Sequence, residues 1–291
     1  MKRSILGVLL VLTFVALGIA AAPTLTFTFS DVVATKTAME TDSYGVNNAG
    51  VITGDYIDSA GVQHGFTLAG KKLTTIDNKN CSSGIFFYGI NSAGTLSGSC
   101  IGTAGGYIAF TWSKGKFTPI SFPKSLQTEA WGINDKDDVV GQYWDTAGAQ
   151  HGFVKRGSKY TSIDVKGDTS AVADGINNAG EIVVQAVNST GGTSSFLYNG
   201  KTFKPISDPN AGTGGTYTNA LNNKGDIAGT YFNSSSQAVG FLYHGGKYHN
   251  VVDPKADNST RCDGLNDKLE IVGRYSPSSG ANVGFKATTK Q

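Results

Sequence analysis

A segment of about 44 residues recurs six times along this chain, and it limits the possible folds more than any other feature of the sequence. The copies begin near Gly45, Gly89, Gly132, Gly175, Ala220 and Gly264, at intervals of 44, 43, 43, 45 and 44 residues. Most of them open on Gly-Ile-Asn or a close variant. A fixed period in this range indicates supersecondary units that stack in a row or repeat around an axis.

Two residue types occupy the same place in all six copies. An asparagine always stands two residues after the start, as Asn47, Asn91, Asn134, Asn177, Asn222 and Asn266. A phenylalanine always stands twenty-one residues after the start, as Phe66, Phe110, Phe153, Phe196, Phe241 and Phe285. Six agreements at each place are very improbable by chance, so the repeat is a strong signal.

Each copy has the pattern of four short strands. A turn of the form Asn-x-x-Gly, such as 47–50, joins the first two strands, because Asn and Gly accept positive φ. A glycine turn such as Gly157 joins the last two. No stretch after the N-terminal apolar run has a sustained apolar period of 3.6 residues. These features predict an all-β fold, a six-bladed β-propeller of four-stranded antiparallel blades. Gly141, nine residues into its copy, is expected where two sheets approach closely.

The two ends of the chain predict how the ring closes. The sixth copy stops at Gln291, six residues after Phe285, and leaves no room for a fourth strand. The segment 24–29 alternates apolar and polar residues ahead of the first copy. We expect this N-terminal strand to complete the last blade, which would leave no free sheet edge. An open β-solenoid, which needs no such strand, is the alternative.

Residues 1–20 have the pattern of a secretory signal peptide: Lys2 and Arg3, an apolar run from Ile5 to Ala20, and small residues at its end. A membrane anchor is the alternative, but the run is short for one. We therefore expect residues 21–291 to form a single propeller domain that is extracellular or periplasmic. Once the signal peptide is cleaved, we expect this domain to have no membrane attachment.

The charge balance argues against nucleic acid as a partner. Lys and Arg number 24 and Asp and Glu number 22, so loss of Lys2 and Arg3 with the signal peptide makes the two signs equal. No basic stripe stands out along the sequence. No phosphate-binding loop, dinucleotide fingerprint or nucleophile elbow is present, and we expect no cofactor. We expect a monomer.

The second copy contains two of the three cysteines. Cys81 precedes its first strand and Cys100 ends its second strand, so both lie at the same rim of the predicted blade. Export would permit a disulfide between them. Unpaired thiols are the alternative. Cys262 has no assigned role.

Two copies contain His-Gly-Phe, as His64 to Phe66 and His151 to Phe153. Together with the Gly-Ile-Asn frame, these tripeptides resemble the bacterial extracellular HAF repeat family, which is named for a His-Ala-Phe motif. The resemblance covers all six copies and implies export, with no established activity and no catalytic residues to transfer. The other four copies have Ile108, Ser194, Val239 or Val283 at the histidine position, which argues against a shared catalytic or metal-binding histidine.

Binding residues are expected on the face with the variable loops, which join the second and third strands and successive blades. Aromatic rings near carboxylates there suit a carbohydrate or a peptide. The candidates for ligand binding are Phe86, Tyr88, Trp131, Tyr143, Trp144, Asp174, Tyr217 and Asp263. For Tyr143, the alternative is packing between blades, because Tyr56, Tyr231 and Tyr275 recur at its position. We identify no catalytic residue and no metal ligand.

Three functions remain open on the sequence alone. The first is a secreted, non-catalytic propeller that binds a glycan, a peptide or a surface partner. The second is a secreted propeller enzyme, a polysaccharide hydrolase or lyase that uses rim carboxylates as acid and base. The third is a structural component of a surface or matrix. The absence of a recognisable catalytic motif favours the first.

Overall fold

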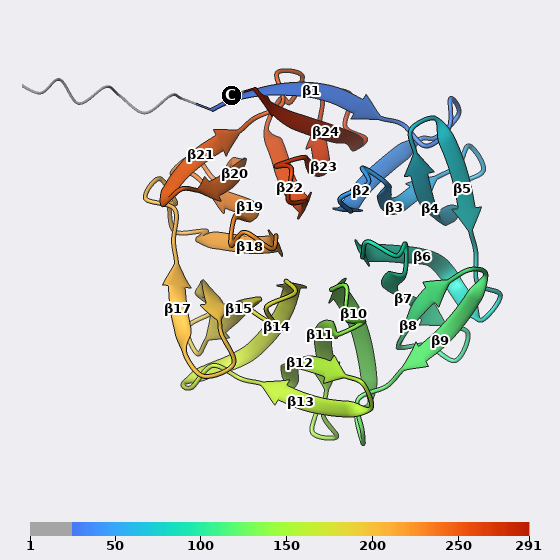
Figure 1. Cartoon of the computed structure of the whole chain (residues 1–291), viewed down its shortest axis with the longest axis vertical. Coiled ribbons are helices and arrows are strands. Elements are labelled where there is room, and N and C mark those ends of the chain that lie inside the picture. The colour runs from blue at the N-terminus through green and yellow to red at the C-terminus, as the bar shows by residue number, and fades with distance from the viewer. Residues whose placement is uncertain (1–24, 291) are drawn as a thin grey trace, which may run out of the picture.

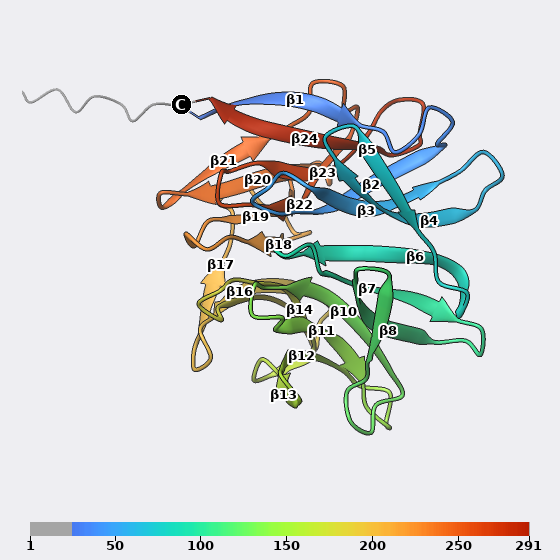
Figure 2. The same cartoon turned by 45° about the vertical axis from the view of Figure 1, so that its right-hand side comes forward.

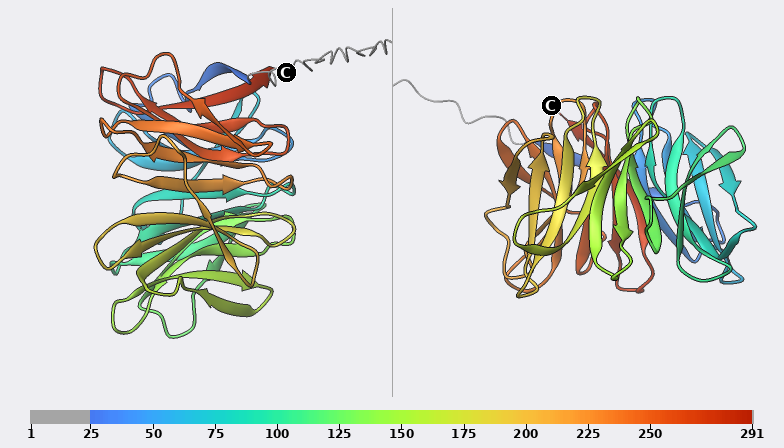
Figure 3. Two further views of the ribbon diagram at one scale, coloured as in Figure 1. Left: turned by 90° about the vertical axis from the view of Figure 1, so that its left-hand side faces the viewer. Right: turned by 90° about the horizontal axis from the view of Figure 1, so that it is seen from below.

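The computed structural model describes residues 25–290, which form a ring of antiparallel β-sheets around a central axis (Figure 1). The tilted view in Figure 2 and the side views in Figure 3 show a short cylinder with the sheets arranged like the segments of a wheel. No helix occurs in this part of the chain. The predicted signal peptide, residues 1–20, lies outside the described residues.

Each of the first four repeat units forms one four-stranded antiparallel sheet. The first sheet contains β2 (Glu40–Val46), β3 (Ile52–Ile57), β4 (Gln63–Ala69) and β5 (Lys72–Ile76). The second contains β6 (Cys81–Ile90), β7 (Leu96–Gly102), β8 (Tyr107–Ser113) and β9 (Lys116–Ile120). The third contains β10 (Gln127–Ile133), β11 (Val139–Trp144), β12 (Gln150–Arg156) and β13 (Lys159–Ile163). The fourth contains β14 (Asp168–Ile176), β15 (Ile182–Asn188), β16 (Thr193–Tyr198) and β17 (Phe203–Ile206).

The last two repeat units belong to one eight-stranded sheet. Its first part contains β18 (Thr216–Leu221), β19 (Ile227–Phe232), β20 (Ala238–His244) and β21 (Lys247–Val251). Its second part contains β22 (Ser259–Leu265), β23 (Ile271–Ser276), β24 (Val283–Lys290) and β1 (Thr26–Val32). A single parallel pair, Ala238 with Ser259, joins the two parts. The predicted β-propeller arrangement of four-stranded antiparallel blades is confirmed.

The N-terminal strand β1 completes the sheet that contains the C-terminus. It pairs antiparallel with β24, from Thr26 opposite Lys290 to Val32 opposite Gly284. The ring of Phe29 packs edge-on against Phe285, with centroids 5.6 Å apart. This pairing confirms the strand that was predicted from the missing fourth strand of the sixth copy.

The hydrophobic core lies between neighbouring sheets. In one cluster, Ala109 and Ile120 of the second unit pack with Ala130, Val139 and Phe153 of the third. The recurring phenylalanine is fully or almost fully buried in five units, as Phe66, Phe110, Phe153, Phe241 and Phe285, and half-buried in the fourth, as Phe196. Each sheet therefore depends on its neighbours for burial of its apolar side chains.

The recurring asparagine forms a closed belt of hydrogen bonds around the axis. Within its own turn, the Asn134 side-chain oxygen accepts hydrogen bonds from the backbone N–H groups of Lys136 and Asp138, each at 3.0 Å. Its Nδ2 donates to the backbone oxygen of Asn177 in the next unit at 3.1 Å. The same donor–acceptor step links every unit to the next, and Asn266 closes the belt by donating to the backbone oxygen of Asn47 at 2.9 Å.

A second, more exposed ring of hydrogen bonds lies beside this belt. The backbone N–H of Asp135 donates to Asn178 Oδ1 at 2.9 Å, and that of Asn178 donates to Asn223 Oδ1 at 2.8 Å. Equivalent links run from Ser92 to Asp135, from Asn223 to Asp267, and from Asp267 to Asn48. Among the described residues the ring lacks only the step from Asn48 to Ser92. The turns that begin at the recurring asparagine, which end on glycine in four units and on Asp137 or Leu269 in the other two, therefore have a structural role.

Cys81 of β6 and Cys100 of β7 form a disulfide, the pairing that their spacing suggested. Cys262 is a free, fully buried cysteine in β22. The disulfide ties the first residue of β6 to the second half of β7.

The two histidines of the His-Gly-Phe tripeptides hold loops in place. His151 Nδ1 is 2.6 Å from Asp164 Oδ1, and its Nε2 is 3.4 Å from Asp145 Oδ2. Burial opposes protonation, but the hydrogen bonds and charges of the two carboxylates outweigh it and raise the pKa of His151. His64 lies in the same way between Asp77 and Asp58. These contacts connect the loop between the second and third strands to the segment after the fourth.

Candidate functional site

The first strand of every unit contains a β-bulge next to the start of the repeat. In the first unit, Ser43 pairs with Gly54 and Gly45 pairs with Thr53, so Tyr44 has no partner in the register. The equivalent residues are Tyr44, Tyr88, Trp131, Asp174, Asn219 and Asp263. A bulge leaves one residue out of the ladder and redirects its side chain. All six of these side chains line one cavity on the axis.

Glycines make room for the bulges and for the neighbouring sheets. A Cβ on Gly141 would lie 2.0 Å from the backbone oxygen of Glu129, in the bulged strand of the same sheet. The expectation that this glycine marks the approach of two sheets was therefore wrong. That approach occurs at the first glycine of the unit, because a Cβ on Gly132 would lie 2.7 Å from the backbone oxygen of Asp174 in the next sheet.

The cavity has a volume of about 460 Å³ and lies at the end of the axis where the first strands begin. This is the face of the loops between second and third strands and between successive units. A separate pocket of about 80 Å³ lies at the other end, among the Asn-x-x-Gly turns. The larger hollow thus lies on the loop-rich face, where binding residues were expected.

The aromatic half of the wall consists of the three bulge residues Tyr44, Tyr88 and Trp131, and Tyr217 and Phe232 add two rings elsewhere in the lining. Tyr88 and Trp131 stack with ring centroids 4.7 Å apart and an interplanar angle of 7°. Tyr44 lies 5.1 Å from Tyr88 on the other side, with a tilted ring. Phe86 stacks parallel to Tyr88 at 5.9 Å. Three consecutive units therefore supply one continuous group of rings.

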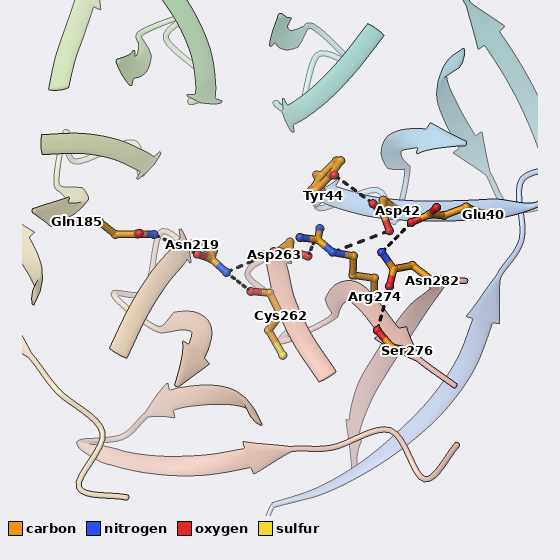
Figure 4. A network of polar contacts seen from close by, with 10 residues as sticks. All are labelled: Glu40, Asp42, Tyr44, Gln185, Asn219, Cys262, Asp263, Arg274, Ser276 and Asn282. Carbon is orange, nitrogen blue, oxygen red and sulfur yellow. Dashed lines mark hydrogen bonds and ion pairs between the residues drawn. The ribbon is translucent and has the colours of Figure 1, made fainter. Parts of the chain in front are cut away.

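The polar half contains the other three bulge residues, Asp174, Asn219 and Asp263, and hydrogen bonds link the last two to their neighbours (Figure 4). Gln185 Nε2 donates to Asn219 Oδ1 at 3.3 Å, and Asn219 Nδ2 donates to Asp263 Oδ1 at 3.3 Å. Arg274 Nη1 then donates to Asp263 Oδ2 at 3.0 Å. Burial raises the pKa of Asp263, and the nearby Arg274 guanidinium partly opposes that rise.

Arg274 lies between Asp263 and Tyr44, where the polar half of the wall meets the aromatic half. Its Nε lies 3.9 Å from Asp42 Oδ1, and its guanidinium lies over the Tyr44 ring, 5.2 Å from the centroid. Tyr44 in turn donates its hydroxyl to Asp42 Oδ2 at 3.2 Å. Here a cation is held between carboxylates and an aromatic ring.

Asp174 is a carboxylate of the cavity wall with an unsatisfied oxygen; Trp131 Nε1 and Thr230 Oγ1 in the same wall also have no hydrogen-bond partner. It is 7% exposed, and its Oδ2 has no hydrogen-bond partner. Burial raises the pKa of Asp174 well above its ordinary value, and the side chain of Gln185 only partly opposes this. A buried polar atom without a partner requires an explanation, such as a bound water or ligand.

The structure places five of the eight candidates on the cavity wall: Tyr88, Trp131, Asp174, Tyr217 and Asp263. Phe86 is not part of the cavity lining but stacks on Tyr88, which is. Tyr143 is buried, stacked on Phe122 and hydrogen-bonded to Ser162, as the packing alternative expected. Trp144 stacks on Tyr107 outside the cavity lining.

Eight residues of the cavity lining were not among the candidates from the sequence: Tyr44, Val172, Gln185, Asn219, Thr230, Phe232, Arg261 and Arg274. Two of them had a usable signal, because Tyr44 and Asn219 directly precede the first residue of a repeat unit, as Tyr88 and Trp131 do. Alignment of the copies at that position would have found all six bulge residues.

Asp55 gives the polar side of this region a pH dependence. It lies in β3 opposite Asp42, is 4% exposed, and accepts a hydrogen bond from Gln63 Nε2 at 2.6 Å. Burial is the largest cause that raises the pKa of Asp55, to about 7, and the charge of Asp42 adds to it. The Gln63 hydrogen bond acts in the opposite direction.

Replacing Asp55 with asparagine should stabilise the protein at high pH. The unfolded chain loses this proton near pH 4, so between about pH 4 and 7 only the folded state holds it, and stability falls as the pH rises through that window. Asp55→Asn keeps an acceptor for Gln63 and cannot ionise. We expect a gain of roughly 1–3 kcal/mol over wild type at pH 8 and little difference at pH 4.5 in urea denaturation. A difference that does not change with pH would contradict this assignment.

Two absences concern residues 25–290 only. No group of three or more His, Cys, Asp or Glu side chains in that range is arranged to hold a metal ion. The same range contains no helix with the length and apolar character that crossing a membrane requires.

Several solved propellers have a similar fold. The lectin of Aleuria aurantia, a six-bladed β-propeller with a described mode of fucose recognition, has a TM-score of 0.53 and 11% identity, over 88% of this chain and 96% of that chain. The SapL1 lectin, in complex with α-methyl fucoside, has a TM-score of 0.54 and 10% identity, over 88% and 97%. The propeller domain of the Trilobed protease from Pyrococcus furiosus, which has an open velcro topology, has a TM-score of 0.54 and 12% identity, over 88% and 83%.

No family model and no curated protein matches the sequence. At identities of 10 to 12%, these likenesses establish the fold alone.

Proposed function

We propose that this chain is an exported, six-bladed β-propeller that binds carbohydrate in the axial cavity without catalysing a reaction. The closed belt of six asparagine links supports the blade count. The disulfide between Cys81 and Cys100 supports export, because such bonds persist in oxidising compartments. Membership of the HAF repeat family, proposed from the motifs, would also imply export.

The observation that carries the binding proposal is the divided wall of the cavity. Sugars present apolar C–H faces and polar hydroxyl edges, and they need aromatic surface and directed hydrogen bonds in one place. Trp131 and Tyr88 provide the aromatic surface, while Asp174 and Asn219 provide hydrogen-bonding groups at the same bulge position of the next units. A volume of about 460 Å³ is within the usual range for small-ligand sites.

The similar propellers are consistent with this choice. The Aleuria aurantia lectin and the SapL1 lectin have structures with bound α-methyl fucoside. Their fold extends over most of this chain, so a propeller of this size can serve as a sugar-binding module. Fucosides are therefore the first sugars to screen.

Replacing Trp131 with alanine should weaken sugar binding at least tenfold, because loss of an aromatic anchor in a binding pocket typically costs more than about 1.4 kcal/mol. Sugars that bind are first identified on a glycan array, and affinities are then measured by titration calorimetry. Trp144→Ala is the matched control, since Trp144 is also half-buried and stacked on a tyrosine but lies outside the cavity lining. Equal affinities for the two variants would remove the cavity from the proposal.

The enzyme alternative is tested with the same samples. Chromatography of each bound oligosaccharide after long incubation would detect hydrolysis or elimination products. Turnover that disappears in Asp174→Asn or Asp263→Asn would replace binding with catalysis as the function. We expect the oligosaccharides to remain intact.

A further inference from the structure

The cavity contains an internal example of how a cation is bound. Asp263 and Tyr44 are bulge residues of neighbouring units, and the Arg274 guanidinium contacts both of them. The ion pair and the ring together favour a positive group at this place. This is one of the two points where the polar half of the wall meets the aromatic half (Figure 4).

The other meeting point has the same two kinds of residue and no cation. Trp131 and Asp174 are bulge residues of the third and fourth units, and these units approach closely where a Cβ on Gly132 would lie 2.7 Å from the Asp174 backbone oxygen. Around the ring, the aromatic Trp131 comes one unit before the carboxylate Asp174, whereas the carboxylate Asp263 comes one unit before the aromatic Tyr44. None of the ion pairs within residues 25–290 includes Asp174.

Asp174 is more than nine-tenths buried, lines the cavity, and has an oxygen with no hydrogen-bond partner. Burial of such a group costs free energy unless a partner compensates. The corresponding carboxylate, Asp263, has that partner in Arg274. The contrast between the two places indicates a missing positive group that a ligand can supply.

We propose that the cavity binds an amine-bearing sugar, with the ligand ammonium group between Asp174 and Trp131, in the role that Arg274 has between Asp263 and Tyr44. This inference rests on the proposed carbohydrate-binding function and names its ligand class. An ammonium donates up to three hydrogen bonds, so it satisfies the free oxygen of Asp174 and also contacts the face or edge of the indole.

The test compares two oligosaccharides that differ only at the nitrogen. Tetramers of β-1,4-linked glucosamine and of N-acetylglucosamine have the same backbone, but acetylation removes the positive charge. We expect wild-type protein to bind the glucosamine tetramer at least tenfold more tightly by titration calorimetry at pH 6. This comparison changes the ligand and not the protein, so its result does not depend on whether a variant folds.

Asp174→Asn should abolish the preference, so that this variant binds the two tetramers with equal affinity. Asp208→Asn is the matched control: Asp208 is 2% exposed and has an unpartnered Oδ2, but it lies outside the cavity lining. This control should keep the preference.

The outcomes separate the two proposals. Equal binding of both tetramers by wild type, or a preference that survives Asp174→Asn, overturns the amine assignment and leaves carbohydrate binding in place. Binding of neither tetramer nor any other glycan, with capture of a lysine-rich peptide that depends on Asp174, overturns the carbohydrate proposal. In that case the part of the cavity beside Asp174 serves a peptide.

Discussion

Replacing Asn134 with leucine should lower the free energy of unfolding by roughly 3–5 kcal/mol. The side chain is 4% exposed, and it accepts hydrogen bonds from two backbone N–H groups of its turn while donating to the backbone oxygen of Asn177. Leucine cannot replace any of these bonds, so buried donors and an acceptor lose their partners. The change also opens the hydrogen-bonded belt around the axis. Urea denaturation followed by tryptophan fluorescence measures the effect.

Asn178→Ala provides the matched comparison. Asn178 belongs to the second, more exposed ring of hydrogen bonds. Its Oδ1 accepts a hydrogen bond from the N–H of Asp135, and its Nδ2 donates to Asp135 Oδ2. Water can satisfy the groups that this variant leaves free, so we expect a loss below about 1 kcal/mol. Similar losses in the free energy of unfolding for the two variants would show that the belt formed by the recurring asparagine has no special importance for stability.

A chain that begins at Val33 should fail to give a stable monomer. It lacks β1, so the backbone edge of β24 and the aromatic surface around Phe285 are exposed. Unpaired edges of this kind promote aggregation. We expect either aggregation or a melting temperature lower by roughly 10–20 °C, which corresponds to a loss of several kcal/mol for a domain of this size. Light scattering and thermal denaturation distinguish these results.

Two further samples make the β1 experiment decisive. A chain that begins at Leu25 retains β1 and should melt as the longer chain does. A synthetic peptide of residues 25–32, added to the truncated chain, should restore part of the lost stability by pairing with β24, since added strands commonly complete a sheet. A truncated chain that melts like the longer one would show that the ring is held closed without this strand.

The repeat made most of the fold predictable, because each recurring residue has a local physical task. Phe153 and its equivalents fill the space between sheets, and the turns that begin at the recurring asparagine impose a tight reversal after each first strand. The pairing of β1 with β24 followed from counting strands in the last copy. These inferences need only side-chain size, turn chemistry and the number of strands per unit.

The site was only partly predictable, because it depends on a backbone irregularity. Trp131 and Asp174 were recognised by residue type, but Tyr44 and Asn219 were not, although all four lie at the bulge position. Nothing in the identity of these side chains encodes a bulge. Trp144 attracted attention for the same reason as Trp131, yet the register of β11 places it against Tyr107.

The bulge position also separates recognition from folding. Six side chains as different as tyrosine, tryptophan, aspartate and asparagine lie on equivalent backbone bends, and the buried phenylalanines and the turn asparagines lie elsewhere in each unit. A library that varies only codons 44, 88, 131, 174, 219 and 263 would therefore sample new ligand specificities on one unchanged scaffold. Such a collection could be sorted by display against sugars of different charge, with thermal stability as an independent check on each clone.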